Sequence, residues 1–120
     1  MSVIGRFLQA VENKDEDTLN ELVHDDYKFI PHIKGVEFGK RDMVSICMSD
    51  SFTRNESRIV YENDEIAIDH AFVTFANGST PEAVISVHQI SDGKIMSTET
   101  GATPLDDGYS LVGTPIFYDE

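Results

Sequence analysis

Five polar residues between Ser57 and Thr100 could bind a ligand or transfer protons: Tyr61, His70, Ser86, His88 and Glu99. They alternate with apolar neighbours, and a period of two is typical of a strand with one covered face. A buried polar group costs free energy unless a partner satisfies it, so this pattern favours a cavity over an ordinary packed core. The sequence therefore predicts a pocket lined by these side chains.

The two histidines are the candidates for acid–base catalysis, because imidazole changes charge near neutral pH without special surroundings. We expect His70 and His88 to be catalytic and Glu99 to orient one of them. Each histidine could equally be a hydrogen-bonded structural residue, and Glu99 could be a salt-bridge partner at a sheet end.

Four further side chains are candidates for ligand binding: Tyr27, His32, Tyr61 and Ser86. Tyr27 and His32 flank Pro31, and either could donate to a ligand carbonyl, although exposed loop positions explain them equally well. No ligand spacing typical of a metal site is present, so we expect no metal and no cofactor.

The first half of the chain predicts three helices. Ile4, Phe7, Leu8 and Val11 recur at helical spacing behind Ser2, which indicates a helix over 3–13. Asp15 is a suitable cap for a short second helix, and a third is expected over about 40–50. A short strand ends before Pro31.

The second half predicts two hairpins, 57–62 with 65–76 and 82–91 with 94–100. Pairing residue 62 with 65 places Tyr61 and His70 inside and sets Arg58 opposite Asp69 outside. Pairing 91 with 94 places Ser86, His88 and Glu99 inside. Both faces of the second hairpin are half apolar, so we expect a second subunit to cover the outer one as a homodimer.

Composition limits the function classes. The 120 residues suit one domain, 1–120, with a core over about 3–101 and an extension over 102–120. A net charge of -13 disfavours nucleic acid and anionic lipid as partners. No apolar run is long enough to span a membrane, the start lacks a secretion signal, and Cys47 is the single cysteine, so we expect a cytoplasmic protein.

The order of these elements resembles the nuclear transport factor 2-like superfamily, which includes ketosteroid isomerases and SnoaL-like polyketide cyclases. The resemblance implies an α+β fold in which a curved antiparallel sheet wraps around three N-terminal helices and forms a cone with an internal pocket. It covers about residues 3–101 and is carried by four motifs: Arg6-Phe7-Leu8, Leu22-Val23-His24-Asp25-Asp26-Tyr27, Phe38-Gly39-Lys40 and Ser91-Asp92-Gly93-Lys94-Ile95.

At the positions of the isomerase's functional residues, this chain has different residues. Phe7 stands where its tyrosine donor would lie, Ile30 or Pro31 where its aspartate base would lie, and Ser86 where its protonated aspartate would lie. The family places the last position inside the cavity, which agrees with the parity of Ser86.

The sequence thus favours a SnoaL-like protein that binds a small apolar molecule. One hypothesis is an isomerase, cyclase or dehydratase that acts on a carbonyl-containing ligand through pocket histidines. The alternative is a non-catalytic ligand-binding or protein-interaction module, because one fold can serve either role.

Overall fold

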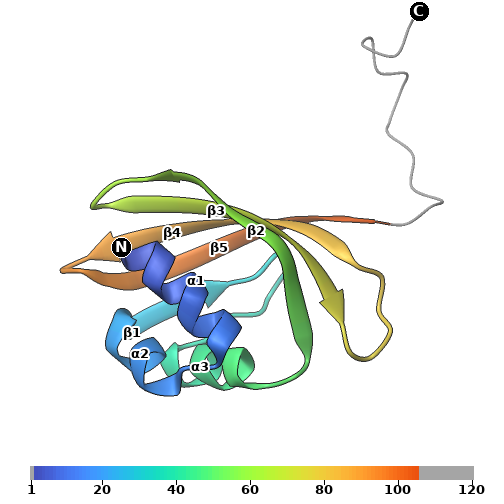
Figure 1. Cartoon of the computed structure of the whole chain (residues 1–120), viewed down its shortest axis with the longest axis horizontal. Helices are drawn as coiled ribbons and strands as arrows, with labels where there is room; N and C mark the ends of the chain where they lie inside the picture. The colour runs from blue at the N-terminus through green and yellow to red at the C-terminus, as the bar shows by residue number, and fades with distance from the viewer. Residues whose placement is uncertain (1, 106–120) are drawn as a thin grey trace, which may run out of the picture.

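A computed structural model describes residues 2–105 as three helices packed against one face of a five-stranded sheet (Figure 1). The elements follow in the order α1 (Val3–Asn13), α2 (Glu16–Leu22), β1 (Val23–Ile30), α3 (Lys40–Met48), β2 (Phe52–Glu62), β3 (Ile66–Phe75), β4 (Glu82–Ser91) and β5 (Lys94–Pro104). The expected α+β class is therefore confirmed.

The first two helices begin at the predicted caps. The Ser2 hydroxyl accepts a hydrogen bond from the Gly5 amide at 3.0 Å, and the Asp15 carboxylate accepts one from the Thr18 amide at 3.2 Å. Each bond satisfies an amide that lacks a partner in the first helical turn. α1 spans the predicted residues 3–13, and the residue that caps its C-terminus, Lys14, adopts the left-handed conformation.

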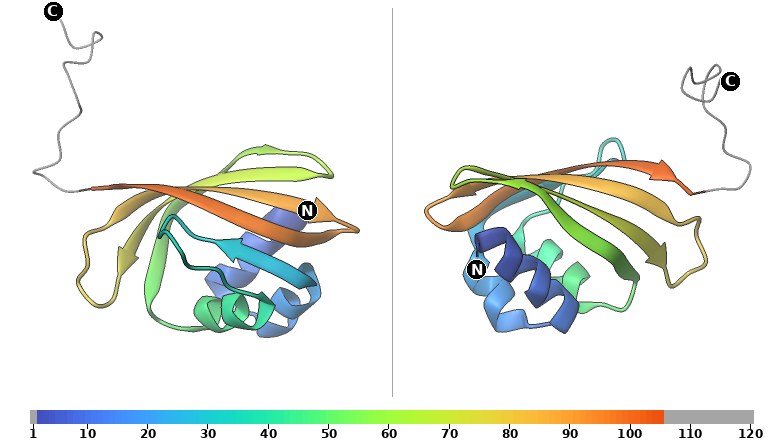
Figure 2. Two further views of the ribbon diagram at one scale, coloured as in Figure 1. Left: turned by 180° about the vertical axis from the view of Figure 1, so that it is seen from behind. Right: turned by 45° about the horizontal axis from the view of Figure 1, so that its top comes forward.

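The sheet order is β1-β5-β4-β3-β2. The sheet is mostly antiparallel, as expected, and β1 adds one parallel pairing, with β5. The sheet curves over the helices and leaves its opposite face uncovered by the described residues (Figure 2). We call the helix-covered side the inner face and the other side the outer face.

The first hairpin has a different register from the predicted one. Glu62 pairs with Ala67, and the Asn63 side chain accepts from the amides of Glu65 and Ile66, both at 2.8 Å. This wider turn is followed by two register shifts between β2 and β3. Such bulges change which residues face each other across a strand pair.

On β3 the inner residues are consequently the odd-numbered ones. Ala67, Asp69, Ala71 and Val73 are buried, whereas Ile66 is 39% exposed. The small side chains of Ala67 and Ala71 leave room for the helices to approach the sheet closely. Ile66, Ile68 and Phe72 lie on the outer face, so the face of β3 that the 62–65 pairing predicts to be inside is the wrong one.

The second hairpin has the predicted tight turn at Asp92-Gly93, with Ser91 paired to Lys94. A register shift between Gln89 and Ile90 then places Thr98 opposite His88 and Glu99 opposite Val87. Glu99 therefore leaves the inner face, contrary to the predicted parity, and Thr98 takes its place there.

The main core lies between the helices and the β1–β5 side of the sheet. Its fully buried side chains include Ile4, Leu19, Val23 and Ile95. No described helix has both the length and the apolar character needed to cross a membrane. Residues 106–120 of the expected extension lie outside the described residues, and β5 continues to Pro104, beyond its predicted end at 100.

Candidate functional site

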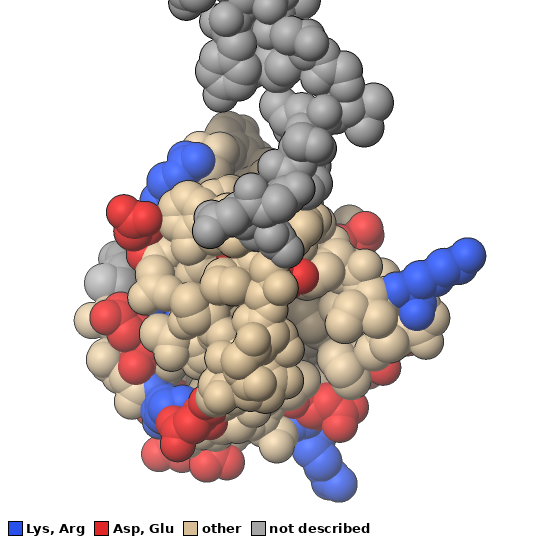
Figure 3. Space-filling model, turned by 90° about the vertical axis from the view of Figure 1, so that its right-hand side faces the viewer, with Lys and Arg blue, Asp and Glu red and all other residues tan. Residues whose placement is uncertain are grey.

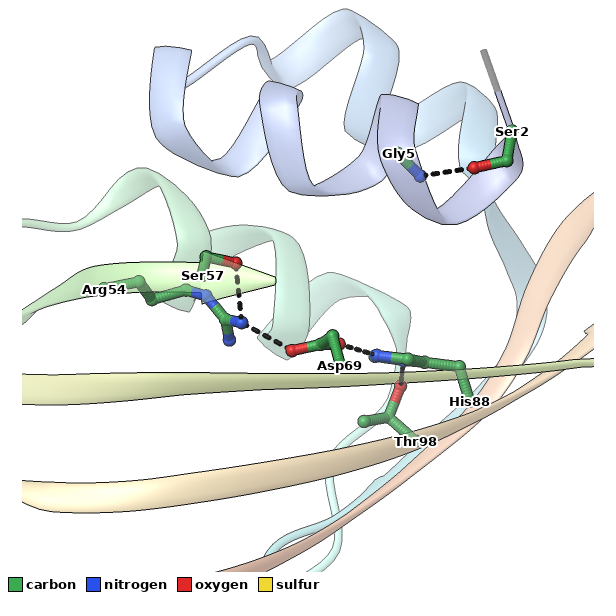
Figure 4. Close-up of polar contacts among 7 residues, drawn as sticks. All are labelled: Ser2, Gly5, Arg54, Ser57, Asp69, His88 and Thr98. Atoms are coloured by element: carbon green, nitrogen blue, oxygen red, sulfur yellow. Dashed lines mark hydrogen bonds and ion pairs between the residues drawn. The ribbon is translucent and has the colours of Figure 1, made fainter. Parts of the chain in front are cut away.

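A buried carboxylate and imidazole meet on the inner face of the sheet. Asp69 on β3 and His88 on β4 lie 2.5 Å apart, measured from Asp69 Oδ2 to His88 Nε2 (Figure 4). Their side chains are 1% and 3% exposed, so almost no water reaches either group. Hydrogen bonding satisfies polar atoms whose burial would otherwise be costly.

Arg54 and Thr98 extend this pair at its two ends. The other carboxylate oxygen of Asp69 accepts from Arg54 Nη2 at 2.5 Å, and His88 Nδ1 lies 2.8 Å from the Thr98 hydroxyl oxygen. The guanidinium also contacts the Ser57 hydroxyl at 3.4 Å. Four side chains from four strands thus form one polar network, Arg54–Asp69–His88–Thr98 (Figure 4).

The network keeps Asp69 ionised. Burial alone would raise the pKa of this carboxyl, but the hydrogen bond from His88 and the charge of Arg54 outweigh that effect. The pKa of Asp69 therefore lies below its usual value of 3.8.

Two buried hydrogen-bond donors near the network have no partner among the described residues: Tyr27 Oη and Arg54 Nε. Tyr27 is 3% exposed, and burial raises the pKa of its hydroxyl, an effect that nearby Thr98 opposes. An unsatisfied buried donor costs roughly 1–3 kcal/mol.

Arg54 connects the network to a hollow of about 750 Å³ between α1 and β2. Apolar side chains including Leu8, Val11, Phe52 and Ile59 contribute to its walls, together with charged residues of both signs. Cys47 also lines the hollow, and burial raises the pKa of its thiol to about 11. The Arg54 guanidinium thus belongs to a residue in the wall of a hollow whose lining mixes apolar and charged side chains.

Three of the predicted site residues lie buried at the inner face. Ser86 and His88 are each 3% exposed on β4, as their parity predicts, and Tyr27 is buried on β1. Phe7 of α1 packs its ring edge-on against His88, with 6.0 Å between the ring centroids. The helix thereby covers the imidazole.

Three other predicted residues are not part of this arrangement. His70 lies on the outer face, pairs with Arg58 and packs against Phe72, so it does not approach His88. Tyr61 is 54% exposed near the end of β2, and Glu99 is exposed on the outer face. A regular register predicts all three residues on the inner face. The bulges in both hairpins change the register, so that prediction is wrong.

His32 lies elsewhere, on the segment that follows β1. Its ring contacts Thr100 and Glu82 instead of the Asp69–His88 pair. It therefore does not line the hollow beside Arg54.

The sequence reasoning missed Asp69, Arg54 and Thr98. Asp69 was expected outside, opposite Arg58, but it is fully buried and bonded to Arg54. One signal could have indicated this: Asp69 shares its parity with Ala67 and Ala71, which suit a closely packed face. Among residues 2–105, no group of three or more potential ligands could hold a metal ion.

No known family profile and no curated protein matches this sequence. Solved structures do match its fold. An NTF2-like protein of unknown function from Cytophaga hutchinsonii is 13% identical, with a TM-score of 0.69 over 85% of this chain and 88% of that one. An LEH-like epoxide hydrolase from M. tuberculosis is 17% identical, with a TM-score of 0.66 over 84% and 80% of the two chains.

A third match, from Kribbella flavida, is assigned as a ketosteroid isomerase and is 10% identical, with a TM-score of 0.72 over 98% of this chain and 85% of that one. Identities this low establish the architecture and not the reaction. The helices on one face, the curved sheet and these matches agree with the expected resemblance: the chain has the nuclear transport factor 2-like fold.

Proposed function

We propose that this protein binds a small, largely apolar molecule in the hollow between α1 and β2 and holds its carbonyl or other neutral oxygen against Arg54. The observation that carries the proposal is the buried Nε of Arg54, which has no hydrogen-bond partner among residues 2–105; Arg54 itself lines the hollow. A ligand oxygen would supply the missing acceptor.

The charge balance favours a neutral oxygen over an anion. Asp69 already offsets the charge of Arg54, and Lys14, which also lines the hollow, pairs with Asp50 at 3.4 Å. A third cation in the lining, Arg58, is accompanied there by Glu12 and Glu56. The chain as a whole carries -13, and acidic side chains are spread over the face shown in Figure 3. Both features disfavour a carboxylate or phosphate ligand.

We propose in addition that the protein carries out acid–base chemistry on that ligand, as an isomerase, cyclase or dehydratase would. Donation from Arg54 would polarise a carbonyl and acidify the adjacent carbon. Asp69 and His88 stand directly behind the guanidinium, with the Asp69 carboxylate 2.5 Å from Arg54 Nη2. A ligand that draws Arg54 toward itself would free this carboxylate, backed by His88, to take up the proton.

The test uses two probes and the same variants. Binding is measured with a naphthyl ketone dye, whose emission changes in an apolar site. Proton transfer is measured by NMR as deuterium uptake at the α carbon of cyclohexenone. Arg54→Lys removes Nε and should weaken dye binding at least about tenfold, since hydrogen bonds to charged donors contribute roughly 1.5–3 kcal/mol. His88→Gln should leave dye binding in place and abolish the exchange.

His70→Gln is the matched control, because His70 lies on the outer face away from the network. It should change neither signal. Dye binding that is equal in the Arg54→Lys variant and the unaltered protein would contradict the binding proposal. Exchange that persists in the His88→Gln variant would contradict the catalytic one alone.

A specific observation favours the second candidate, a binding module without catalysis. Both carboxylate oxygens of Asp69 and both ring nitrogens of His88 already have partners within the chain. In that case the network serves only to hold Arg54. Dye binding that depends on Arg54, with no exchange on any ketone tested, would support this candidate.

We further propose that the protein forms a homodimer through the outer face. Ile66, Ile85 and Val87 expose 39%, 44% and 38% of their surface there, which is costly on a sheet that faces water. Light scattering at micromolar concentration should give twice the chain mass, and Ile85→Glu should give a monomer. A monomeric mass for the unaltered protein would contradict this assembly.

A further inference from the structure

A second set of hydroxyl, imidazole and carboxylate lies at the far end of the inner face, outside the site described above. His32 Nδ1 is 2.9 Å from the Thr100 hydroxyl oxygen, and His32 Nε2 is 3.0 Å from Glu82 Oε1. The side chains of His32 and Glu82 are 28% and 24% exposed, so solvent reaches the set. We call these three residues the His32 triplet.

The His32 triplet repeats the arrangement of the buried network. Thr98, His88 and Asp69 make the same contacts in the same order, and Thr98 and Thr100 lie two residues apart on β5, on one side of the strand. The buried set is closed to solvent, whereas the His32 triplet is open. In this structure a dissolved molecule can therefore reach the His32 triplet directly.

The hydrogen-bond roles in the triplet follow from its partners. In the tautomer with the proton on Nε2, the Glu82 carboxylate accepts from Nε2–H and Nδ1 accepts from the Thr100 hydroxyl. The His32 amide also donates to the Thr100 oxygen, at 2.9 Å. This amide would stabilise negative charge that develops on the oxygen as its proton leaves.

We propose that the His32 triplet activates the Thr100 hydroxyl as a nucleophile toward small, uncharged esters. A hydroxyl on a histidine that a carboxylate orients is the arrangement from which acyl transfer proceeds. Thr100 Oγ1 forms a bond to the acyl carbon, its proton passes to His32 Nδ1, and the C–O bond to the alcohol breaks. The departing alkoxide takes the proton from His32, which leaves an acyl ester on Thr100.

The surroundings favour an uncharged acyl donor. Ile33, next to His32, is 61% exposed and Ile30 is 40% exposed, so apolar surface lies beside the triplet in the chain. Glu82 and the net charge of -13 repel anionic donors such as acyl phosphates. We therefore expect aryl and short alkyl esters to react, and acyl phosphates to react slowly.

The experiment incubates the protein with p-nitrophenyl acetate at neutral pH and follows both released nitrophenolate and protein mass. The expected result is one acetyl group per chain, located at Thr100 by fragmentation of the tryptic peptide that begins at Ile95. Removal of the base, His32→Gln, should slow this acetylation about 100-fold or more. Thr100→Val should abolish it and Thr100→Ser should retain it.

His24→Gln controls for the general reactivity of histidines with this ester. His24 is on β1, its Nδ1 accepts from the Asp26 amide at 3.0 Å, and no hydroxyl among residues 2–105 is hydrogen-bonded to its ring. Equal rates in the His32→Gln and His24→Gln variants, or no adduct on Thr100, would overturn the proposal and leave the triplet a structural tie. If His32→Gln does not fold, the Thr100→Ser and Thr100→Val pair decides the outcome.

Discussion

The carboxylate of Asp69 lies 2.5 Å from His88 Nε2 and is held at its other oxygen by Arg54. A carboxylate closed off from water is stable only with such partners, because burying an isolated charge is very costly. The pair therefore links the strand that carries Arg54 to the centre of the sheet, and several consequences can be measured.

Asp69→Asn should reduce the free energy of unfolding at neutral pH by about 3–5 kcal/mol, since it breaks a buried ion pair. Urea unfolding followed by circular dichroism measures this loss. Asp25→Asn is a matched control, because Asp25 pairs with Lys40 at an exposed position and should contribute little. A loss as small as that of the control would contradict the assigned role of Asp69.

The same carboxyl should make stability depend on acid. The pKa of Asp69 is lower in the folded chain than its usual 3.8, so the folded state favours the ionised form. Its contribution is complete above the unfolded value and is lost as pH falls through the folded value. Between pH 5 and strongly acid pH, roughly, the unaltered protein should lose more stability than Asp69→Asn. Parallel pH profiles for the two proteins would contradict this linkage.

Arg54→Met should destabilise the fold more than Arg54→Lys. Methionine leaves the Asp69 carboxylate with His88 as its one remaining partner. Lysine keeps a positive charge that can pair with Asp69, although it lacks the forked donor geometry of the guanidinium and should still cost some stability. Thermal unfolding of the two variants measures the difference. Equal midpoints would mean that the charge of Arg54 contributes nothing to the fold.

Tyr27→Phe should leave stability unchanged or raise it slightly. The Tyr27 hydroxyl is buried without a partner among the described residues, so its removal relieves a desolvation cost and breaks no hydrogen bond. Urea unfolding gives the comparison. A loss of about 1 kcal/mol or more would instead show that the hydroxyl bonds to Thr98.

Cys47 should resist modification in the folded protein. Burial raises the pKa of its thiol to about 11, and the thiolate is the reactive form. We expect maleimide labelling at pH 7.5 to be far slower than for glutathione and to become fast in urea. Rapid labelling of the native protein would show that the helices open readily at the hollow.

The local pattern of the sequence predicts the helices and several of the turns. The spacing of Ile4, Phe7 and Val11 with the cap at Ser2 gives α1, and Asp92-Gly93 gives the second turn. These features depend on residues close together in the chain, where propensity and hydrogen bonding act locally. The burial of Ser86 and His88 also follows from alternation along one strand.

Only the tertiary structure decided which side of β3 the helices cover. Alternation with a period of two separates two faces but does not say which one is covered, and β3 carries apolar residues on both. The sequence by itself determined that polar groups would share a covered face, with His88 among them. Bulges place Asp69 instead of His70, and Thr98 instead of Glu99, on the inner face. These bulges arise from strand pairing between residues distant in the chain, so the network forms only in the folded structure.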